Sequence, residues 1–233
     1  IGKFLIAEEK GKIFGIGGDF TFEKVSSYGY MAVLPEYRGK GVGTEIFKNL
    51  LEIAKNLNCE TNFLYASNLG EPIYKKFGFQ ERYYGRMYSI SSDQSISSIK
   101  NKVVNILKKI PDWLLELDKE AMGFERANYL NLRINLGAKI LAIDNEGYGL
   151  LATSRLGPLI AINLNAALLI IKKSIELGAS HMIVAEHQYL PENIYKSVVL
   201  NEMENRASIK MMYGKKIFEN LDLLYAIGTY AKG

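Results

Sequence analysis

The feature that most constrains the fold of this chain is an internal repeat. Residues 3–16 have a counterpart in residues 139–152, and each copy has two apolar stretches around a polar turn that contains glycine. Both copies therefore begin as a predicted β-hairpin. Each continues with a strand, a helix, a strand, a second helix and a last strand, and the copies end alike at residues 86–88 and 210–213. A repeat of this length predicts two domains of one fold.

A serine-rich stretch separates the two copies. Residues 89–102 contain six serines and few bulky side chains, a composition that suits a linker. We predict a first domain over residues 1–90, a linker over 91–104 and a second domain over 105–233.

Three alternating glycines, Gly39, Gly41 and Gly43, stand directly before an amphipathic helix of the first copy. Apolar residues recur in that helix at three- and four-residue spacing, which indicates one buried face. A helix N-terminus presents outward-pointing N–H groups and about half a positive charge, and glycines leave these groups open to a ligand. The pattern predicts a site for a diphosphate, and a plain solvated turn is the alternative.

Two familiar phosphate loops do not match this pattern. In the P-loop a lysine follows the last glycine, whereas Lys40 precedes Gly41. The dinucleotide fingerprint needs a glycine at the position that Thr44 occupies. Neither a P-loop nucleotide site nor a dinucleotide site is therefore expected.

A third pattern does match. Residues 38–43 read Arg-x-x-Gly-x-Gly and follow a strand that ends Val-x-Pro at residues 33–35. This resembles the acyl-CoA loop of the GNAT N-acetyltransferases. The resemblance implies an α/β (α+β) fold for each copy, with a mixed, mostly antiparallel central sheet flanked by helices. It also implies that the strand before the loop splays from its neighbour and binds the pantetheine arm of acetyl-CoA through the backbone of Met31 and Val33.

A second segment supports the same resemblance. Residues 68–79 are similar to the GNAT pattern Asn-x-x-Ala-x-x-Leu-Tyr-x-Lys-x-Gly-Phe, except that Glu71 and Pro72 replace small residues. By this resemblance Asn68 binds the pantetheine near its reacting end, and Tyr74 assists the thiolate that leaves. A phenol suits that chemistry. A tyrosine that only packs is the alternative, since the chain has 15 tyrosines.

The residues that the resemblance assigns to the cofactor lie on the strand, on the glycine loop and in this second segment: Met31, Val33, Arg38, Gly39, Lys40, Gly41, Val42, Gly43, Thr44, Asn68 and Tyr74. Tyr74 is also the expected catalytic residue. Glu23 and Asp19 are candidates for the base that deprotonates the acceptor amine, although a surface charge of the hairpin is the simpler interpretation of each.

The second copy lacks these motifs. Residues 157–167 contain no Arg-x-x-Gly-x-Gly before the helix expected from Asn163 to Leu177. We predict a degenerate repeat that binds no acyl-CoA. Asp118 and Arg126 lie in a segment that resembles the start of the C-terminal domain in a two-domain GNAT subgroup. They are interpreted either as an ion pair at a helix end or as part of the site.

Helical patterns precede the second hairpin, at residues 99–110 and from Trp113 to about Leu136. The first copy begins at its hairpin, whereas GNAT domains start with a strand and two helices before it. We therefore expect that residues before Ile1 are missing or that another segment replaces them.

Composition narrows the classes of function. The net charge is +4 without a dense basic stripe, so no nucleic-acid partner is expected. The sequence has no run of about 18 uncharged apolar residues, so no membrane span is expected either. Cys59 and two histidines are too few for a disulfide or a zinc site, so we expect no metal, and they fit a cytoplasmic protein. A homodimer is possible.

These motifs predict an N-acetyltransferase that transfers an acetyl group from acetyl-CoA to a primary amine of a small molecule or peptide by direct attack. One alternative is a non-catalytic acyl-CoA-binding or sensor protein of the same fold, which would bind CoA without transfer. Another is a structural or interaction protein in which the repeat serves as a scaffold. Absence of CoA binding would favour that second alternative.

Overall fold

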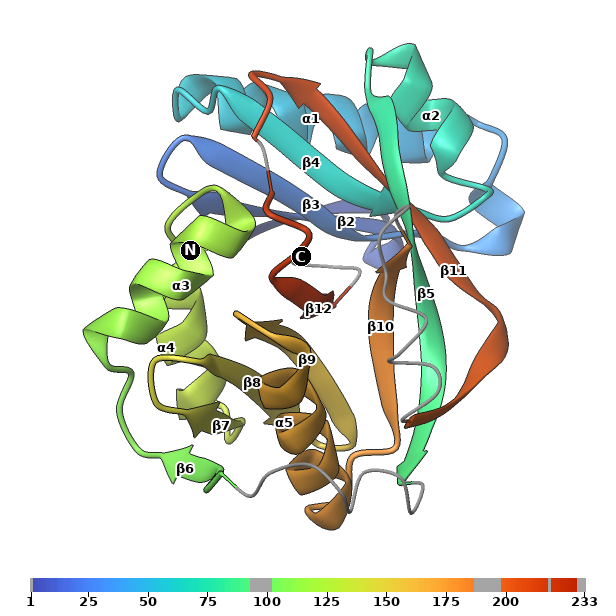
Figure 1. The fold of residues 1–233 in the computed structure, drawn as a ribbon. Coiled ribbons are helices and arrows are strands. Elements are labelled where there is room, and N and C mark those ends of the chain that lie inside the picture. Colours follow the sequence, from blue (N-terminus) through green and yellow to red (C-terminus); the bar gives the residue numbers. More distant parts are fainter. Residues whose placement is uncertain (1, 93–101, 187–197, 218, 230–233) are drawn as a thin grey trace. The chain divides into compact units, whose positions relative to one another are not determined.

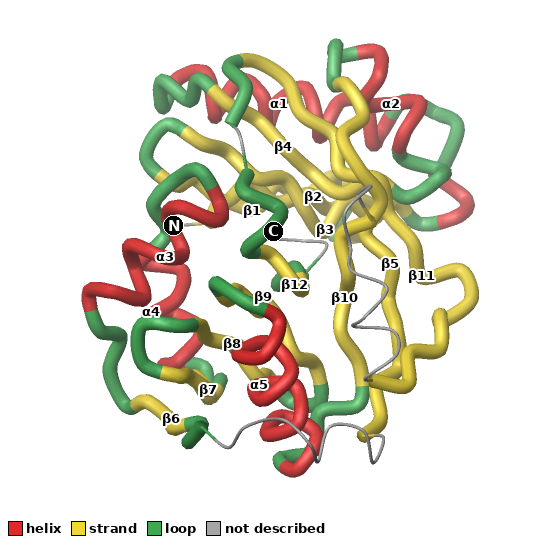
Figure 2. The backbone as a smooth tube through the Cα atoms, viewed as in Figure 1, coloured by secondary structure: helices red, strands yellow, loops and turns green. Residues whose placement is uncertain are grey.

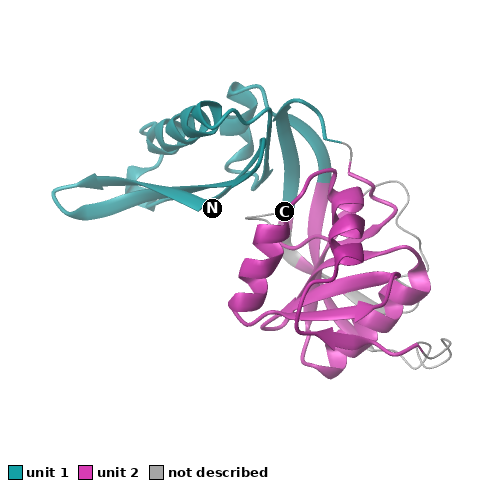
Figure 3. Cartoon of the chain, turned by 90° about the vertical axis from the view of Figure 1, so that its left-hand side faces the viewer, with its two compact units in different colours: residues 1–83, 208–217, 230–233 teal, residues 84–207, 218–229 magenta. Residues whose placement is uncertain are grey.

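The computed structural model describes residues 2–92, 102–186, 198–217 and 219–229. The chain divides into two compact units, and each combines separate stretches of sequence (Figure 3). Unit 1 contains residues 1–83, 208–217 and 230–233, and unit 2 contains residues 84–207 and 218–229.

The sheet of unit 1 begins as an antiparallel meander of three strands. Its third strand then runs parallel to the fourth, which pairs antiparallel with part of a strand from the C-terminal region. The strands, in chain order, are β1 (Gly2–Glu9), β2 (Lys12–Phe22), β3 (Val25–Val33), β4 (Thr61–Ala66) and, through its residues 209–214, β11 (Val198–Gly214).

Two helices, α1 (Val42–Asn56) and α2 (Glu71–Lys76), belong to unit 1 (Figure 1). Helix α1 packs closely on β2, because a Cβ at Gly17 would lie only 2.7 Å from Cγ2 of Ile46. Phe47 and Leu50 on the same helix are fully buried in the core of this unit. The periodic apolar residues of the sequence therefore form the buried face of α1, as expected.

Unit 2 repeats this plan (Figure 2). Three strands form an antiparallel meander, and the third of them runs parallel to β10. Its strands are β6 (Asn105–Leu107), β7 (Lys139–Ile143), β8 (Gly147–Ala152), β9 (Arg155–Ala161), β10 (His181–Glu186), β12 (Leu224–Ala226) and residues 84–89 of β5 (Gln80–Ser92). Its helices are α3 (Asp112–Met122), α4 (Ala127–Asn135) and α5 (Leu164–Glu176).

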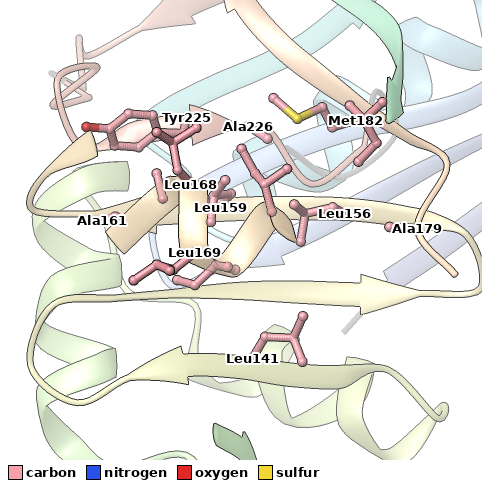
Figure 4. Packing of buried hydrophobic residues seen from close by; sticks show 14 of the residues in the cluster. Leu141, Leu156, Leu159, Ala161, Leu168, Leu169, Ala179, Met182, Tyr225 and Ala226 are labelled. Carbon is pink, nitrogen blue, oxygen red and sulfur yellow. The ribbon is translucent and has the colours of Figure 1, made fainter. Parts of the chain in front are cut away.

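The core of unit 2 forms between α5 and the strands. Leu169, Ile170 and Ile171 of α5 are buried in one apolar cluster with residues of β9, β10 and β12. Figure 4 shows Leu168 and Leu169 next to Leu159 of β9. Full burial of each such side chain stabilises the fold by roughly 1.5–3 kcal/mol. The two copies of the repeat are thus two domains of one fold, each with a mixed, mostly antiparallel sheet.

The last strand of each copy of the repeat pairs in the unit that is built mainly from the other copy. Residues 84–89 of β5, at the end of the first copy, pair with β10 in unit 2. Residues 209–214 of β11, at the end of the second copy, pair with β4 in unit 1. The division at residues 90 and 105 stays a prediction, and the compact units differ from it in this exchange of strands.

Two expected elements take a different form. The helix expected over residues 99–110 is wrong within the described part, because Asn105–Leu107 forms β6, which pairs with β7 and is the last strand of the sheet on this side. Here the hydrogen bonds that an open sheet edge offers outweigh a short helical pattern. The long helix expected from Trp113 is two helices, α3 and α4. Gly123 ends α3 in the left-handed conformation with φ 77°.

Helices α3 and α4 are joined by a buried ion pair. Asp118 and Arg126 are 1% and 2% exposed, and Arg126 Nη2 donates to Asp118 Oδ1 at 2.8 Å. Tyr148 of β8 also donates its hydroxyl proton to Asp118 Oδ1. Burial, followed by the charge of Asp118, raises the pKa of Tyr148, so this hydroxyl stays protonated. The expected ion pair therefore exists and lies within the core of unit 2.

We predict that Asp118→Ala lowers the free energy of unfolding by about 3–5 kcal/mol, because it leaves the Arg126 charge buried without its carboxylate. Trp113, the one tryptophan of the chain, lies in the same helix, so denaturation followed by its fluorescence reports on this unit. Glu116→Ala, on the exposed side of α3, is the matched control and should change stability by less than about 0.5 kcal/mol. Equal effects of the two substitutions would contradict the structural role of the pair.

Candidate active site

The candidate site of unit 1 begins where two parallel strands part. β3 and β4 pair from Val25 and Thr61 as far as Tyr28 and Leu64, and the ladder stops there. β3 continues to Val33 along β2 alone. We call this point the β3–β4 fork. The splay implied for this strand by its sequence is therefore present in the pairing.

Part of the β3 backbone beyond the fork faces away from β2. The Leu34 N–H donates to the carbonyl oxygen of Phe14 at 2.9 Å. Successive residues of an antiparallel strand direct their backbone groups to opposite sides. The N–H and C=O groups of Val33 therefore point toward the side that β4 has left, whereas Met31 lies at an irregularity of the β2–β3 pairing, where this alternation does not apply. These are backbone groups of the kind that could bind an extended amide-containing chain.

The glycine loop follows β3 through a short 3-10 helix, Pro35–Tyr37. Gly39 and Gly41 have φ angles of 72° and 81°, in the left-handed region that other residues avoid. Gly41 is the N-cap of α1 and, in the described structure, supplies no side-chain hydrogen bond to the first turn. The amides of Val42, Gly43 and Thr44 thus form a helix N-terminus without a side-chain cap. Such a terminus attracts anions.

Gly43 lies where the loop, β3 and α2 meet. A Cβ at Gly43 would be 3.6 Å from both Val33 Cγ2 and Ile73 Cδ1, which is ordinary contact. Gly43 therefore needs no special conformation. The absence of a side chain leaves its backbone accessible at this point. The convergence brings Val33, from the strand, and Gly43, from the loop, together with α2. Ile73 also packs against the apolar core of unit 1, and nothing in the sequence indicated that it would lie beside the loop.

Two cations flank the loop. Arg38 Nε donates to the carbonyl oxygen of Val33 at 3.0 Å, so this side chain ties the loop to the end of β3. Lys40 Nζ lies 5.4 Å from the ring centroid of Tyr37, which stacks on Phe14 at 4.3 Å. Both side chains are positive and exposed, and they add local charge that favours an anionic ligand.

Tyr74 lies on α2 in the buried core of unit 1. It is 6% exposed, its ring packs edge-on against Phe47 at 4.7 Å, and it lies against Gly70, where a Cβ would be 2.9 Å from the ring. Burial raises the pKa of Tyr74 to about 12. The phenol therefore stays protonated at neutral pH and can donate a hydrogen bond or a proton.

Asn68 lies in the turn between β4 and α2 and is exposed. The turn is held by the Ser67 carbonyl oxygen, which accepts from the N–H groups of Gly70 and Glu71 at 2.9 Å each. Pro72 stands in the first turn of α2, where the missing N–H costs nothing. Replacement of small residues by Glu71 and Pro72 therefore leaves the helix intact.

Neither candidate base is an exposed carboxylate near the fork. Glu23 lies in the β2–β3 turn with φ 48°, at the far end of β3 from Val33. Asp19 is fully buried, accepts a hydrogen bond from Ser26 and accepts another from Thr21 at 3.3 Å. Burial raises the pKa of Asp19, against these two hydrogen bonds, which lower it. The surface-charge interpretation is wrong for Asp19.

The corresponding helix start in unit 2 is closed. Asn163 caps α5, and its side-chain oxygen accepts from the N–H of Ala166 at 2.9 Å. The capping side chain thus takes an amide that the glycine loop of unit 1 leaves open. This agrees with a repeat that lacks the diphosphate loop.

A cavity of about 490 Å³ also lies in unit 1, between α1 and the edge strand β1. Its floor is apolar and includes Leu5 and Ile53, while Glu45 and Glu52 stand among its polar residues. Two carboxylates would repel phosphate groups. This cavity is therefore a poor match for an anionic cofactor, in contrast to the glycine loop.

Comparison with known proteins identifies the fold. Models of the acetyltransferase (GNAT) domain match residues 1–81 and residues 114–226. A crystal structure of a candidate acetyltransferase from Pyrococcus horikoshii is 33% identical, with a TM-score of 0.90, over 99% of this chain and 80% of that one. No curated protein matches the chain.

Two more distant structures share the fold alone. A GCN5-related N-acetyltransferase from Kribbella flavida is 15% identical, with a TM-score of 0.59, over 91% of this chain and 60% of that one. A second, from Anabaena variabilis, is 13% identical, with a TM-score of 0.59, over 90% of this chain and 62% of that one.

A fork in a parallel pair of strands, followed by a glycine loop at a helix start, defines an acetyltransferase fold in unit 1. The chain belongs to the GNAT acetyltransferase family and contains two GNAT domains. Among the helices that the structure describes, none is long and apolar enough to cross a membrane.

We predict that Asp19→Asn changes the pH dependence of stability. Because the pKa of Asp19 is higher in the folded state, the folded protein holds the proton more tightly than the unfolded chain. This contribution to stability is complete below the unfolded pKa of about 3.9, and it is lost as pH rises through the folded pKa. The asparagine of the variant does not ionise, so the stability of the variant does not change through this group. The stability of Asp19→Asn relative to wild type should therefore increase from pH 4 to pH 7.

Urea denaturation followed by circular dichroism at several pH values measures this difference. Asp144→Asn, at an exposed turn of unit 2, is the control and should run parallel to wild type. A difference between wild type and Asp19→Asn that does not vary with pH would rule out a raised pKa for Asp19.

Proposed function

We propose that unit 1 is an N-acetyltransferase that transfers an acetyl group from acetyl-CoA to a primary amine of a small molecule or peptide. The observation that carries the proposal is the conjunction of the β3–β4 fork with the uncapped start of α1. Residues 38–44 would hold the diphosphate, and the backbone of Met31 and Val33 would bind the pantetheine arm. Asn68 would bind the arm near its reacting end. Family membership supports the acyltransferase class, and the acceptor is part of the proposal.

Acyl transfer in this site needs no covalent enzyme intermediate. The neutral amine attacks the thioester carbonyl, a new C–N bond forms, the attacking nitrogen gives up a proton to water, and the carbon–sulfur bond breaks to release a thiolate. A backbone N–H such as that of Val33 would stabilise the oxyanion that forms during attack. The amine must first lose a proton, since an alkylammonium has a pKa of about 10.4.

Tyr74 would stabilise the leaving thiolate. An ordinary thiol has a pKa of about 8.5, well below the pKa of about 12 that burial gives Tyr74. Complete proton transfer from the phenol to the thiolate is therefore uphill. In this proposal Tyr74 acts mainly as a hydrogen-bond donor to sulfur, and the proton on the released thiol comes finally from solvent.

A non-catalytic acyl-CoA-binding protein is the second candidate. One observation favours it: Asp19, a candidate base, is fully buried and Glu23 lies in a remote turn. An enzyme would remain consistent with this observation if a water molecule carried the proton of the acceptor amine to bulk solvent. Turnover with a panel of amines separates the two candidates, because a sensor binds acetyl-CoA and releases no free thiol in response to any amine.

We predict that Gly41→Val weakens acetyl-CoA binding at least about 100-fold, because a β-branched residue resists a φ of 81° and its side chain would cover the uncapped amides. Gly11→Val is the matched control: Gly11 has φ 79°, and a Cβ at either glycine would meet no atom within 4 Å. Calorimetry with acetyl-CoA measures both. Equal affinities for the two variants would remove the loop from the cofactor site.

We predict that Tyr74→Phe lowers kcat about 100-fold and leaves the Kd for acetyl-CoA nearly unchanged, since only the departing thiolate loses a partner. Tyr28→Phe is the control, because Tyr28 is also buried and its hydroxyl donates to Asn62 Oδ1 at 2.6 Å. That change should reduce stability and spare turnover. Thiol release, followed spectroscopically, gives kcat, and an unchanged kcat in Tyr74→Phe would exclude the tyrosine from the reaction.

A further inference from the structure

Unit 2 contains a second fork. β9 and β10 start as parallel partners at Arg155 and His181, and their ladder ends one residue later, at Leu156 and Met182. Gly157 and Pro158 follow on β9, and a proline cannot donate a backbone hydrogen bond to a neighbouring strand. The β9–β10 fork is the repeat's counterpart of the β3–β4 fork.

The β9–β10 fork is filled by the protein's own chain. β12 pairs antiparallel with β9, with Leu224 opposite Ile160 and Ala226 opposite Leu159. The Ala161 N–H donates to the Leu223 carbonyl oxygen at 3.0 Å. β12 therefore takes the backbone groups that β9 presents beyond the fork.

The same segment also reaches the other strand of the fork. The Ile227 N–H donates to the Ile183 carbonyl oxygen of β10 at 2.9 Å, and these two residues form a bridge. Residues 223–227 are thus hydrogen-bonded to both β9 and β10. In unit 1, among the described residues, β3 has only β2 and β4 as partners.

Burial shows that this segment is part of the core. Leu224, Ala226 and Ile227 are each no more than 1% exposed. Tyr225 and Ala226 belong to the apolar cluster of unit 2, and Figure 4 shows Ala226 between Leu159 of β9 and Met182 of β10. Displacement of the segment would expose this apolar surface, so it is held firmly.

Gly157 makes room for the segment. A Cβ at Gly157 would collide with the backbone carbonyl oxygen of Ile227. This contact is with backbone, which cannot turn aside as a side chain can. Gly157 therefore permits the close approach of residues 223–227 to the fork.

We propose that residues 223–227 are an internal plug, which takes in unit 2 the position that the pantetheine arm of acyl-CoA takes in unit 1. The comparison with unit 1 rests on the proposed function. The plug itself rests on the pairing of β12. Together with the capped start of α5, the plug closes unit 2 to acyl-CoA, so each chain binds one acyl-CoA.

Amide hydrogen exchange, measured by NMR on the full chain, tests the plug. In the wild type the amides of Ala161 and Ile227 should exchange slowly. Gly157→Val should accelerate both at least about tenfold, since it displaces the plug from the fork. Ile162→Val, at a residue that is 52% exposed beside Ala161, is the matched control and should leave both rates unchanged.

A second variant keeps the test decisive if Gly157→Val does not fold. Ile227→Pro removes the N–H that donates to Ile183, and it should accelerate exchange of the Ala161 amide. Exchange of Ala161 and Ile227 at unprotected rates in the wild type would overturn the plug. Unchanged exchange of Ala161 in the folded variants would do the same.

Native mass spectrometry with CoA adds a count of bound cofactor. One CoA per wild-type chain is expected, and the count should stay at one in Gly157→Val, because α5 still lacks the glycine loop. Two CoA molecules per wild-type chain would overturn the plug. No bound CoA would instead refute the proposed function of unit 1, while the exchange rates would still decide the plug.

Discussion

The parting of β3 from β4 is the constraint on which the candidate site depends. A strand inside a sheet normally satisfies its N–H and C=O groups on both sides. Beyond Tyr28, β3 keeps β2 on one side and loses β4 on the other, so the backbone of Val33 is directed at a position where no described strand pairs with it. An extended chain with its own amides is the natural ligand for such groups. The glycine loop then offers uncapped amides to a negatively charged group at the end of that ligand.

The two halves show how one fold yields an open and a closed form. In unit 1 the fork is followed by glycines with left-handed φ angles and a helix without a side-chain cap. In unit 2 an asparagine caps the helix and a strand of the same chain enters the fork. The strands that the two units share keep the same order. A few residues at a helix start and a short C-terminal strand suffice.

Much of this could be predicted from sequence because the signals are local. Gly39, Gly41 and the apolar spacing of α1 report backbone conformation and burial directly, and the repeat reports the number of domains. Other features depend on partners distant in sequence. β6 is a strand because it pairs with β7, and the plug, residues 223–227, has no local pattern that distinguishes it from a loop. Likewise, nothing in the spacing of Asp19 showed that Ser26 and Thr21 would enclose it.

The exchange of last strands between the units has a consequence for how the protein is made. β4 pairs with residues 209–214, so the sheet of unit 1 stays incomplete until these residues, about 145 positions after β4, have left the ribosome. Until then β4 (Thr61–Ala66), whose residues are buried in the folded protein, has an unpaired edge. Unpaired strand edges are sites at which nascent chains associate wrongly. Folding of unit 1 is thus tied to synthesis of the second copy, which carries no glycine loop.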